Sequence, residues 1–387
     1  MTTSSEPPRR LRLGMVGGGR GAFIGAVHRI AARMDDRYEL VAGALSSDPE
    51  RALASAADLR IAPDRRYADF HAMAKAESSR SDGIDVVAIV TPNNMHYAPA
   101  RAFLECGIDV ICDKPLTSRL EDALELEQIA RQSGRIFGVT YNYTGYPLVR
   151  QARALVAAGE LGAIRVVQVE YAQDWLTTKL EDTGHKGALW RTDPEQCGIA
   201  GSIGEIGTHA INLAEFVSNL RLEAVAADLA ISVPGRRLDD NAGVLLRFEG
   251  GARGMLWTSQ VAVGRENSLS LRVYGEKGSL EWMQEEPNVL RFVRFGDPPQ
   301  SLTRAGAGSR PEGLRASRVP SGHPEGYLEA FAQLYRDLAE QISARREGRS
   351  PDSACLCVPG IGEGVQGMRF VAAAVASNQN GSQWTML

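Results

Sequence analysis

The sequence has few cysteines, no marked excess of charge of one sign and no long hydrophobic run. Its 5 cysteines in 387 residues are odd in number and too few for a disulfide framework, which agrees with a reducing compartment. No run reaches the roughly 18 apolar residues of a membrane span. The opening MTTSSEPPRR leads into a short apolar run that glycines interrupt, so we expect no signal peptide and a cytoplasmic protein.

The charges nearly cancel, with 43 Lys and Arg residues against 47 Asp and Glu residues and a net charge of −4. Acids and bases are interspersed, which leaves no basic stripe for a phosphate backbone and no polybasic tail for a membrane. We therefore expect neither nucleic acid nor a membrane as partner. The pair Cys355-x-Cys357 is too closely spaced for zinc, so we predict no metal and interpret both residues as buried small hydrophobes.

Strand and helix patterns alternate through the first half. The apolar run 11–17 leads into the turn Gly17-Gly18-Gly19-Arg20-Gly21, and a helical pattern follows over 23–31. Further strands are expected at 38–45, 85–90, 107–112 and 135–142, and helices beginning at Asp48-Pro49, near residue 97 and after residue 116. This alternation predicts an α/β fold whose N-terminal domain, residues 1–143, has a doubly wound parallel sheet.

The second half has a different pattern. Strands at 163–173, 242–250, 251–262, 267–275 and 278–283 are joined mostly by tight turns that contain glycine. Helices are expected at 149–158, 203–216, 325–345 and 363–377, and a surface loop at 297–324. We predict a second α/β domain, residues 144–387, with a large, open, mostly antiparallel sheet, and its last helices as candidates to pack back on the first domain.

A glycine turn between a first strand and a first helix suits a dinucleotide, because its pyrophosphate needs backbone N–H groups at a helix N-terminus. We interpret Gly25-x-x-His28 as the third glycine of the fingerprint, after three extra residues. The alternative is a structural turn without a ligand. The predicted cofactor residues lie in this turn and at the ends of the other strands: Gly17, Gly19, Arg20, Gly21, Ala22, Phe23, Ile24, Ser46, Ser47, Arg51, Thr91, Pro92, Asn93, His96, Asp113, Lys114 and Asn142.

The choice between NAD and NADP normally depends on an acidic residue at the end of the second strand. Ser46 occupies that place here, so it neither repels nor strongly binds a 2′-phosphate. Arg51 suits NADP, whereas Asp48 suits the ribose of NAD. The preference stays open, with a lean to NAD.

Oxidation of a carbinol needs a base and a positive group that stabilises the developing alkoxide. Glu205 and His209 are four residues apart on a predicted helix, and Lys114 follows a predicted parallel strand. We predict His209 as the proton acceptor, Lys114 as the group that polarises the hydroxyl, and Glu205 as orienter of the imidazole and substrate ligand. Alternatively, Glu205 and His209 are an ordinary exposed pair and Lys114 a solvated loop residue.

Together with the glycine turn, the motifs TPNNMH (residues 91–96), DKPL (113–116) and AGSIGEIGTHAINL (200–213) resemble the Gfo/Idh/MocA family of nicotinamide-dependent sugar and cyclitol oxidoreductases. The resemblance implies that residues 1–143 form a Rossmann dinucleotide-binding domain and that a homodimer or homotetramer forms through the C-terminal sheet. It also implies catalytic roles for Lys114, Glu205 and His209. Asp113 stands where the family usually has Glu, and Glu205 where it has Asp. The stretches YNYTGYP and QDWL…WRTDP resemble the branch that includes levoglucosan dehydrogenase, which oxidises a ring hydroxyl, often at C3.

We therefore predict an NAD(P)-dependent dehydrogenase of a small polyhydroxylated substrate: a sugar, anhydrosugar, glycoside or inositol. Predicted substrate residues, besides Glu205 and His209, are Tyr141, Tyr143, Trp175, Lys179, Trp190 and Arg191, because indole faces and charged donors suit a pyranose ring. Core packing is the alternative for the tryptophans, and helix capping for Asn93 and His96. The alternative functions are a redox-neutral enzyme that retains its nicotinamide (a glycosidase, or paired oxidation and reduction) and a non-catalytic nucleotide sensor.

Overall fold

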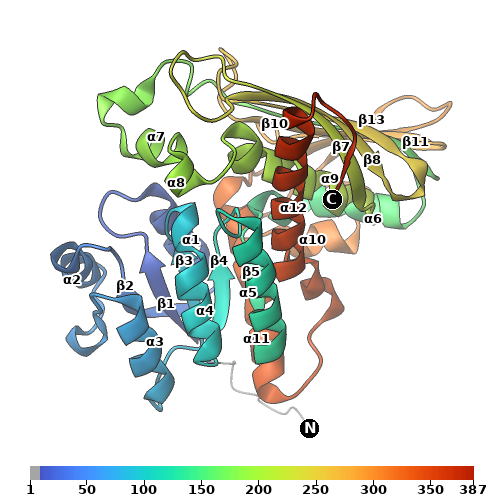
Figure 1. Cartoon of the computed structure of the whole chain (residues 1–387). Coiled ribbons are helices and arrows are strands. Elements are labelled where there is room, and N and C mark those ends of the chain that lie inside the picture. The colour runs from blue at the N-terminus through green and yellow to red at the C-terminus, as the bar shows by residue number, and fades with distance from the viewer. Residues whose placement is uncertain (1–8) are drawn as a thin grey trace, which may run out of the picture.

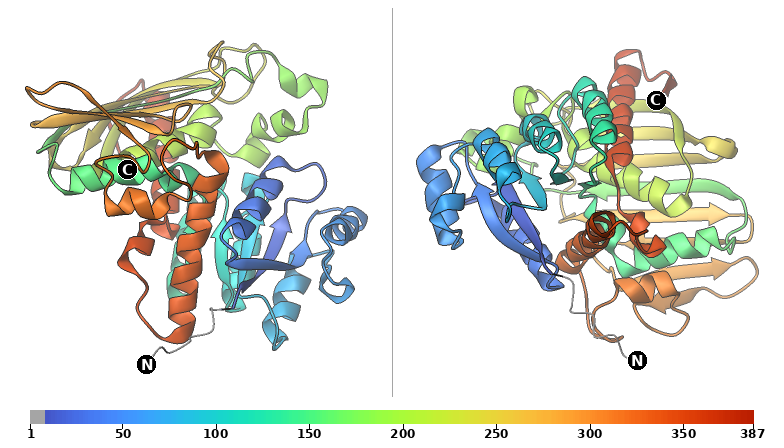
Figure 2. Two further views of the ribbon diagram at one scale, coloured as in Figure 1. Left: turned by 180° about the vertical axis from the view of Figure 1, so that it is seen from behind. Right: turned by 90° about the horizontal axis from the view of Figure 1, so that it is seen from below.

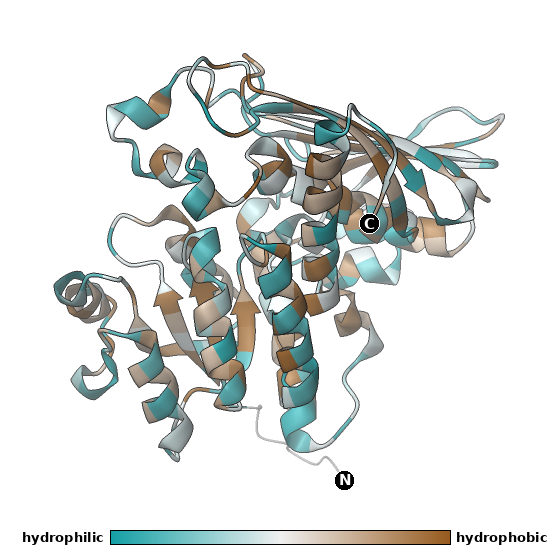
Figure 3. Ribbon diagram, in the orientation of Figure 1, coloured by the Kyte–Doolittle hydropathy of each residue, from teal (hydrophilic) through white to brown (hydrophobic). Residues whose placement is uncertain are grey.

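The computed structural model describes residues 9–387 and contains a five-stranded and a nine-stranded sheet (Figure 1). The smaller sheet is parallel, in the order β2-β1-β3-β4-β5. Its strands are β1 Leu11–Gly17, β2 Tyr38–Ala44, β3 Val86–Val90, β4 Asp109–Cys112 and β5 Phe137–Val139. Strand β3 is buried throughout, and Figure 3 colours the strands of this sheet mainly as hydrophobic. The strand order changes direction between β1 and β3, where doubly wound sheets bind ligands.

Helices cover both faces of the parallel sheet, as the alternating pattern predicts. They are α1 Phe23–Met34, α2 Pro49–Asp58, α3 Phe70–Ser79, α4 Tyr97–Glu105 and α5 Leu120–Ser133. Helix α2 begins as predicted, since the carboxylate of Asp48 accepts the backbone N–H of Arg51 at 2.7 Å and Pro49 occupies the first turn. Helix α3 is missing from the prediction, because few of its side chains are both apolar and buried and its pattern is weak.

The larger sheet has the order β13-β12-β11-β10-β6-β9-β8-β7-β14. Its strands are β6 Ile164–Ala172, β7 Leu222–Ala230, β8 Asn241–Phe248, β9 Arg253–Ser259, β10 Ser268–Gly275, β11 Gly278–Met283, β12 Val289–Arg294, β13 Gln300–Thr303 and β14 Thr385–Met386. The mostly antiparallel sheet is confirmed, with β6 and β9 as its parallel pair. Strands β7, β12, β13 and β14 extend it beyond the predicted strands.

Helices α6 Pro147–Ala157 and α9 Thr208–Ser218 lie against this sheet, and the shorter helices α7 Lys186–Arg191 and α8 Pro194–Cys197 precede α9 in the chain. The predicted helix 203–216 is not uniform, because a π-helical turn, Ile203–Gly207, precedes α9. Helix α9 shares a buried core with β6 and with Trp282 of β11. The opposite face of the sheet exposes large apolar side chains, among them Leu245, Met255 and Trp257.

Two long C-terminal helices, α11 Tyr327–Glu347 and α12 Ile361–Gln379, connect the two sheets. Phe331, Tyr335 and Leu338 of α11 share a core with Leu13 and Met15 of β1, and Figure 2 shows α11 beside the parallel sheet. Helix α12 contacts both α5 and β7. The C-terminal helices thus belong in part to the core of the parallel sheet.

The prediction of one loop at 297–324 was wrong, because the segment contains β13 and the helix α10 Pro311–Ala316. The buried ion pair between Arg304 and Glu325, 2.9 Å long, holds this segment against its neighbour. The many Pro, Gly and Arg residues of this segment led to the prediction of a loop, whereas contacts such as this ion pair stabilise an ordered structure.

The cysteines are unpaired in the described residues, 9–387. Cys355 is buried as predicted, and its sulfur accepts a hydrogen bond from Arg315, whereas Cys357 is partly exposed, contrary to the prediction. Within the same range, no helix is both long and apolar enough to cross a membrane, and no three His, Cys, Asp or Glu side chains are grouped as a metal site.

Candidate active site

The glycine turn after β1 is packed so closely that side chains are excluded from it. Gly17 and Gly18 have φ angles of +78° and +71°. A Cβ atom on Gly25 of α1 would lie 2.4 Å from the Cα atom of Gly18. Gly25 is therefore the glycine at which the first helix packs against the turn, as the spacing predicts, and the turn forms a cradle of bare backbone.

The cradle lies next to the end of β3, since Gly17 pairs with Val90 and Thr91 and Pro92 follow. Ala22, Phe23 and Ile24 form the start of α1, where no side chain caps the backbone N–H groups. Phe23 is 75% exposed. Free N–H groups at a helix N-terminus beside bare backbone fit the pyrophosphate of a dinucleotide.

The loop between β2 and α2, next to the cradle, carries small polar and charged residues. The hydroxyl of Ser46 accepts the backbone N–H of Asp48 at 3.1 Å, and Ser47 is exposed. A solvent-open cavity of about 590 Å³ lies between the cradle and α2, and its charged lining consists of Arg20, Arg51, Lys186, Asp48 and Glu50. Arg20 is paired with Asp58 at 2.5 Å.

The predicted catalytic groups Lys114 and Glu205 lie together. The ammonium group of Lys114 donates to the backbone oxygen of Glu205 at 2.9 Å and lies 3.8 Å from its carboxylate. Arg191 donates to the same carboxylate at 2.9 Å, as does the amide of Asn93. Burial opposes ionisation of Glu205, but the two cations and the amide outweigh it and lower its pKa to about 2.

This arrangement corrects the predicted role of Glu205. Its carboxylate is held by Lys114, Arg191 and Asn93, and in residues 9–387 no hydrogen bond joins it to His209. Two full charges compete for the carboxylate, and they are stronger partners than a neutral imidazole. Glu205 therefore orients Lys114 and Arg191 rather than His209.

The π-helical turn that carries Glu205 is anchored by a buried aspartate. Both carboxylate oxygens of Asp239 accept backbone N–H groups, from Gly201 at 2.6 Å and from Ile203 at 2.8 Å. Asp239 lies between β7 and β8, so a segment of the large sheet fixes the catalytic turn. π turns often occur at functional sites.

The same connection also fixes the stretch with Trp175. Arg236 is buried, pairs with Glu181 at 3.0 Å and donates to the backbone oxygens of Leu176 and Thr178. Sequence reasoning missed both Asp239 and Arg236, because their partners are distant in the chain.

His209 is buried between three tyrosines. Its ring centroid lies 4.8 Å from that of Tyr143, 5.7 Å from Tyr141 and 6.2 Å from Tyr171. Its Nδ1 atom is buried without a hydrogen-bond partner in the described part of the chain. Burial, and then the charge of Lys114, hold the pKa of His209 well below its usual 6.5, so the imidazole is neutral at pH 7 and able to accept a proton.

A polar chain leads away from His209 toward the large sheet. The hydroxyls of Tyr143 and Tyr171 lie 2.5 Å apart, and Tyr171 donates to Asn267 at 2.8 Å. Gln173 donates to the same oxygen of Asn267, and Trp175 donates to Gln173. Sequence reasoning found Tyr143 and Trp175; it missed Tyr171, Gln173 and Asn267, which only strand pairing brings together.

Several predicted cofactor residues have other contacts. Both ring nitrogens of His96 face backbone oxygens, Pro115 at 2.8 Å and Thr91 at 2.9 Å, which leaves none for a cofactor. Asp113 accepts the hydroxyl of Thr140 and the N–H of Lys114. Asn93, His96 and Asp113 thus hold the loops that carry Lys114 and Glu205. Neither Asn93 nor His96 caps α4 through its side chain.

The remaining predicted residues divide between the site and its surroundings. Asn142 is buried, and its amide nitrogen has no partner in residues 9–387, so a donor is available beside Tyr141. Trp190 is half-buried and stacks under the guanidinium of Arg191, 4.0 Å away. Lys179 pairs with Asp182 at 3.2 Å and lies beside Gly235, outside the group around Glu205.

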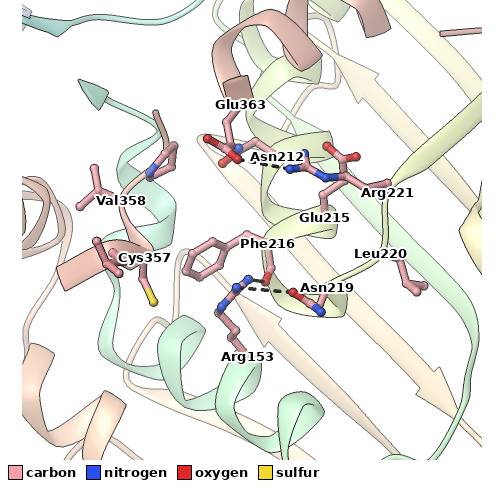
Figure 4. A pocket seen from close by; sticks show the side chains of 12 residues that line it. Arg153, Asn212, Glu215, Phe216, Asn219, Leu220, Arg221, Cys357, Val358 and Glu363 are labelled. Carbon is pink, nitrogen blue, oxygen red and sulfur yellow. Dashed lines mark hydrogen bonds and ion pairs between the residues drawn. The ribbon is translucent and has the colours of Figure 1, made fainter. Parts of the chain in front are cut away.

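A second cavity, of about 150 Å³, lies behind α9 (Figure 4). Glu215 lines it and accepts hydrogen bonds from the backbone of Leu222 at 2.8 Å and from Gln366 at 3.1 Å. Burial is the largest effect on this carboxyl and raises its pKa to about 7.

We expect the variant Glu215→Gln to be more stable than wild type at pH 8 and equally stable at pH 4. The folded protein holds a proton on Glu215 up to about pH 7, whereas the unfolded chain loses it near 4.5. Wild-type stability therefore falls as pH rises through this window, by about 3 kcal/mol in total. Melting temperatures at both pH values test this, with the exposed Glu223→Gln as control. An equal difference between variant and wild type at both pH values would contradict it.

Two family models match the chain in sequence. Residues 11–141 match the oxidoreductase family with an NAD-binding Rossmann fold, and residues 149–281 match the GFO/IDH/MocA C-terminal domain. The uncharacterized oxidoreductase YfiI of Bacillus subtilis is 34% identical over 377 residues, 97% of this chain and 96% of that protein.

Relatives whose names give a substrate or ligand also match. Levoglucosan dehydrogenase of Pseudarthrobacter phenanthrenivorans is 27% identical over 75% of this chain and 77% of its own. An inositol dehydrogenase homolog from Azotobacter vinelandii, complexed with NAD+, is 39% identical and covers 100% of both chains with a TM-score of 0.93. Its complex with NADH and myo-inositol is 38% identical and covers 98% of both chains with a TM-score of 0.89. A relative matches the chain over nearly its full length, two family models match its two parts, and the glycine cradle follows β1. The chain therefore belongs to the Gfo/Idh/MocA family of NAD-binding oxidoreductases.

Proposed function

We propose that this oxidoreductase oxidises a ring hydroxyl of a sugar, anhydrosugar, glycoside or inositol. The observation that carries the proposal is the buried His209, which packs against Tyr141 and follows, four residues later, the Glu205 whose backbone oxygen Lys114 contacts at 2.9 Å. A base that is uncharged at neutral pH and a nearby fixed cation are what removal of a hydroxyl proton requires.

In the proposed reaction, the substrate C–H bond breaks and its electron pair leaves as hydride. The O–H proton moves to the imidazole of His209, and the C–O single bond becomes a carbonyl. NAD bound at the glycine cradle would supply the hydride acceptor. Lys114 polarises the oxygen and stabilises its developing negative charge, and Glu205 keeps Lys114 and Arg191 in position.

The substrate class is supported by the surroundings of His209. The tyrosines offer apolar faces, while the chain from Tyr171 through Asn267 and Gln173 to Trp175 offers hydrogen-bonding groups for several hydroxyls. A largely uncharged ring with many hydroxyls fits such a surface. Levoglucosan and myo-inositol, named in two of the relatives, belong to this class, and the C3 hydroxyl is the first position to examine.

A panel of inositols, pyranosides and anhydrosugars, each supplied with NAD or NADP and followed at 340 nm, tests this function. We expect NAD reduction with at least one member and a ketone as product. No reduction, with nicotinamide retained through purification and substrate still converted, would support the redox-neutral alternative instead. Binding of NADH without any conversion would support the nucleotide sensor.

The homodimer or homotetramer predicted through the large sheet is also a proposal, as is the cytoplasmic location. The exposed Leu245, Met255 and Trp257 on the open face support an assembly. Molar mass by light scattering tests it, and a purely monomeric protein would contradict it.

A further inference from the structure

Helix α7 belongs to the chain segment after β6, yet it lies over the parallel sheet's ligand crevice (Figure 1). The ammonium group of Lys186, at the start of α7, lies 3.9 Å from the position that a Cβ atom on Gly21 would occupy. Lys186 also lines the 590 Å³ cavity, whose other charged residues are Arg20, Arg51, Asp48 and Glu50. A cation from the second part of the chain therefore faces the cradle.

We propose that Lys186 binds the pyrophosphate of the dinucleotide, as a contact supplied across the crevice by α7. The inference rests on the NAD-binding cradle and not on the identity of the oxidised substrate.

Charge and exposure support this role. Arg20 is already paired with Asp58, and the carboxylate of Asp48 is used by the backbone of Arg51. Lys186 is exposed, and no ion pair engages it within residues 9–387. An exposed lysine above bare glycine backbone gains a partner when a doubly charged pyrophosphate occupies the cradle.

The anchoring of α7 supports the same role. The ring of His185 accepts the backbone N–H of Ala188 at 3.2 Å and caps the helix, while Arg191 at its other end pairs with Glu205. The contact between Arg191 and Glu205 thus fixes the C-terminal end of α7. Because α7 is short, its fixed position keeps the backbone of Lys186 within reach of Gly21.

Titration of NADH by fluorescence compares Lys186→Met with wild type. At low ionic strength we expect the dissociation constant to rise about five- to tenfold, and at 1 M salt to differ less than twofold, because salt screens the lost charge. Lys186→Arg should restore most of the affinity. The control, Lys75→Met, removes the same charge from the exposed face of α3 and should bind NADH as wild type does.

The outcomes separate the possible errors. An unchanged dissociation constant in Lys186→Met would overturn the inference, as would a loss that salt does not reduce. Weaker binding of NADPH with unchanged binding of NADH would assign Lys186 to the 2′-phosphate and overturn the pyrophosphate contact. If wild type binds NADH but oxidises no member of the panel, the proposed function fails while this inference stands.

Discussion

Replacement of His209 by asparagine is expected to lower kcat by about two to four orders of magnitude. Asparagine is close to histidine in size and polarity but cannot take up a proton. Because burial and Lys114 keep the wild-type imidazole neutral, the acid limb of the wild-type pH–rate profile should lie below pH 6.5. Activity should fall as pH drops through the pKa of His209, and this limb should disappear in the variant.

The measurements are kcat and kcat/KM across pH 5 to 9 with the substrate found in the panel, alongside NADH affinity, and the acid limb is taken from kcat/KM. Since His209 lies among tyrosines and away from the glycine cradle, NADH should bind the variant with nearly wild-type affinity. Unchanged turnover, or an acid limb that survives in His209→Asn, would show that another group accepts the proton.

The second large effect is expected from Lys114→Met. Loss of the cation that stabilises the developing alkoxide should lower kcat by roughly 100- to 1000-fold. The carboxylate of Glu205 keeps Arg191 and Asn93 as partners, so it is not left buried without a counter-charge. We therefore expect the variant to fold.

The pH dependence of the Lys114→Met variant distinguishes an electrostatic role of Lys114 from a purely structural one. Because the charge of Lys114 lowers the pKa of His209, its removal should move the acid limb of kcat/KM to higher pH. Lys114→Arg keeps the charge and should leave the limb near its wild-type position. A slower Lys114→Met enzyme with an unshifted limb would argue against electrostatic contact between Lys114 and His209.

Local patterns predicted the parts of the molecule that local physics determines. The buried strand 86–90, the cap at Asp48 and the close approach of Gly25 each follow from residues within a few positions of one another. The π turn at 203–207 keeps its helical direction and was therefore included in a predicted helix. Helix α3 and the strands β12, β13 and β14 have no comparably clear pattern of apolar residues and were not predicted.

Local sequence patterns could not predict which side chains contact one another within the site. Asn93 and Glu205 are 112 positions apart, and only the packing of α8 against the loop after β3 brings them together. Sequence motifs identified Lys114, Glu205 and His209 as a group. They did not reveal that the Glu205 carboxylate pairs with both Lys114 and Arg191, nor that Tyr171 donates a hydrogen bond to Asn267.

The connection between β7 and β8 has a consequence for exchanging segments between relatives. Asp239 holds the catalytic turn, while Arg236, three residues earlier, holds the stretch with Trp175. A chimera that replaces residues 231–240 would alter the reaction centre and the substrate surface at once, although the segment bears no predicted site residue. Recombination designed to change substrate preference should therefore transfer this connection together with residues 174–205.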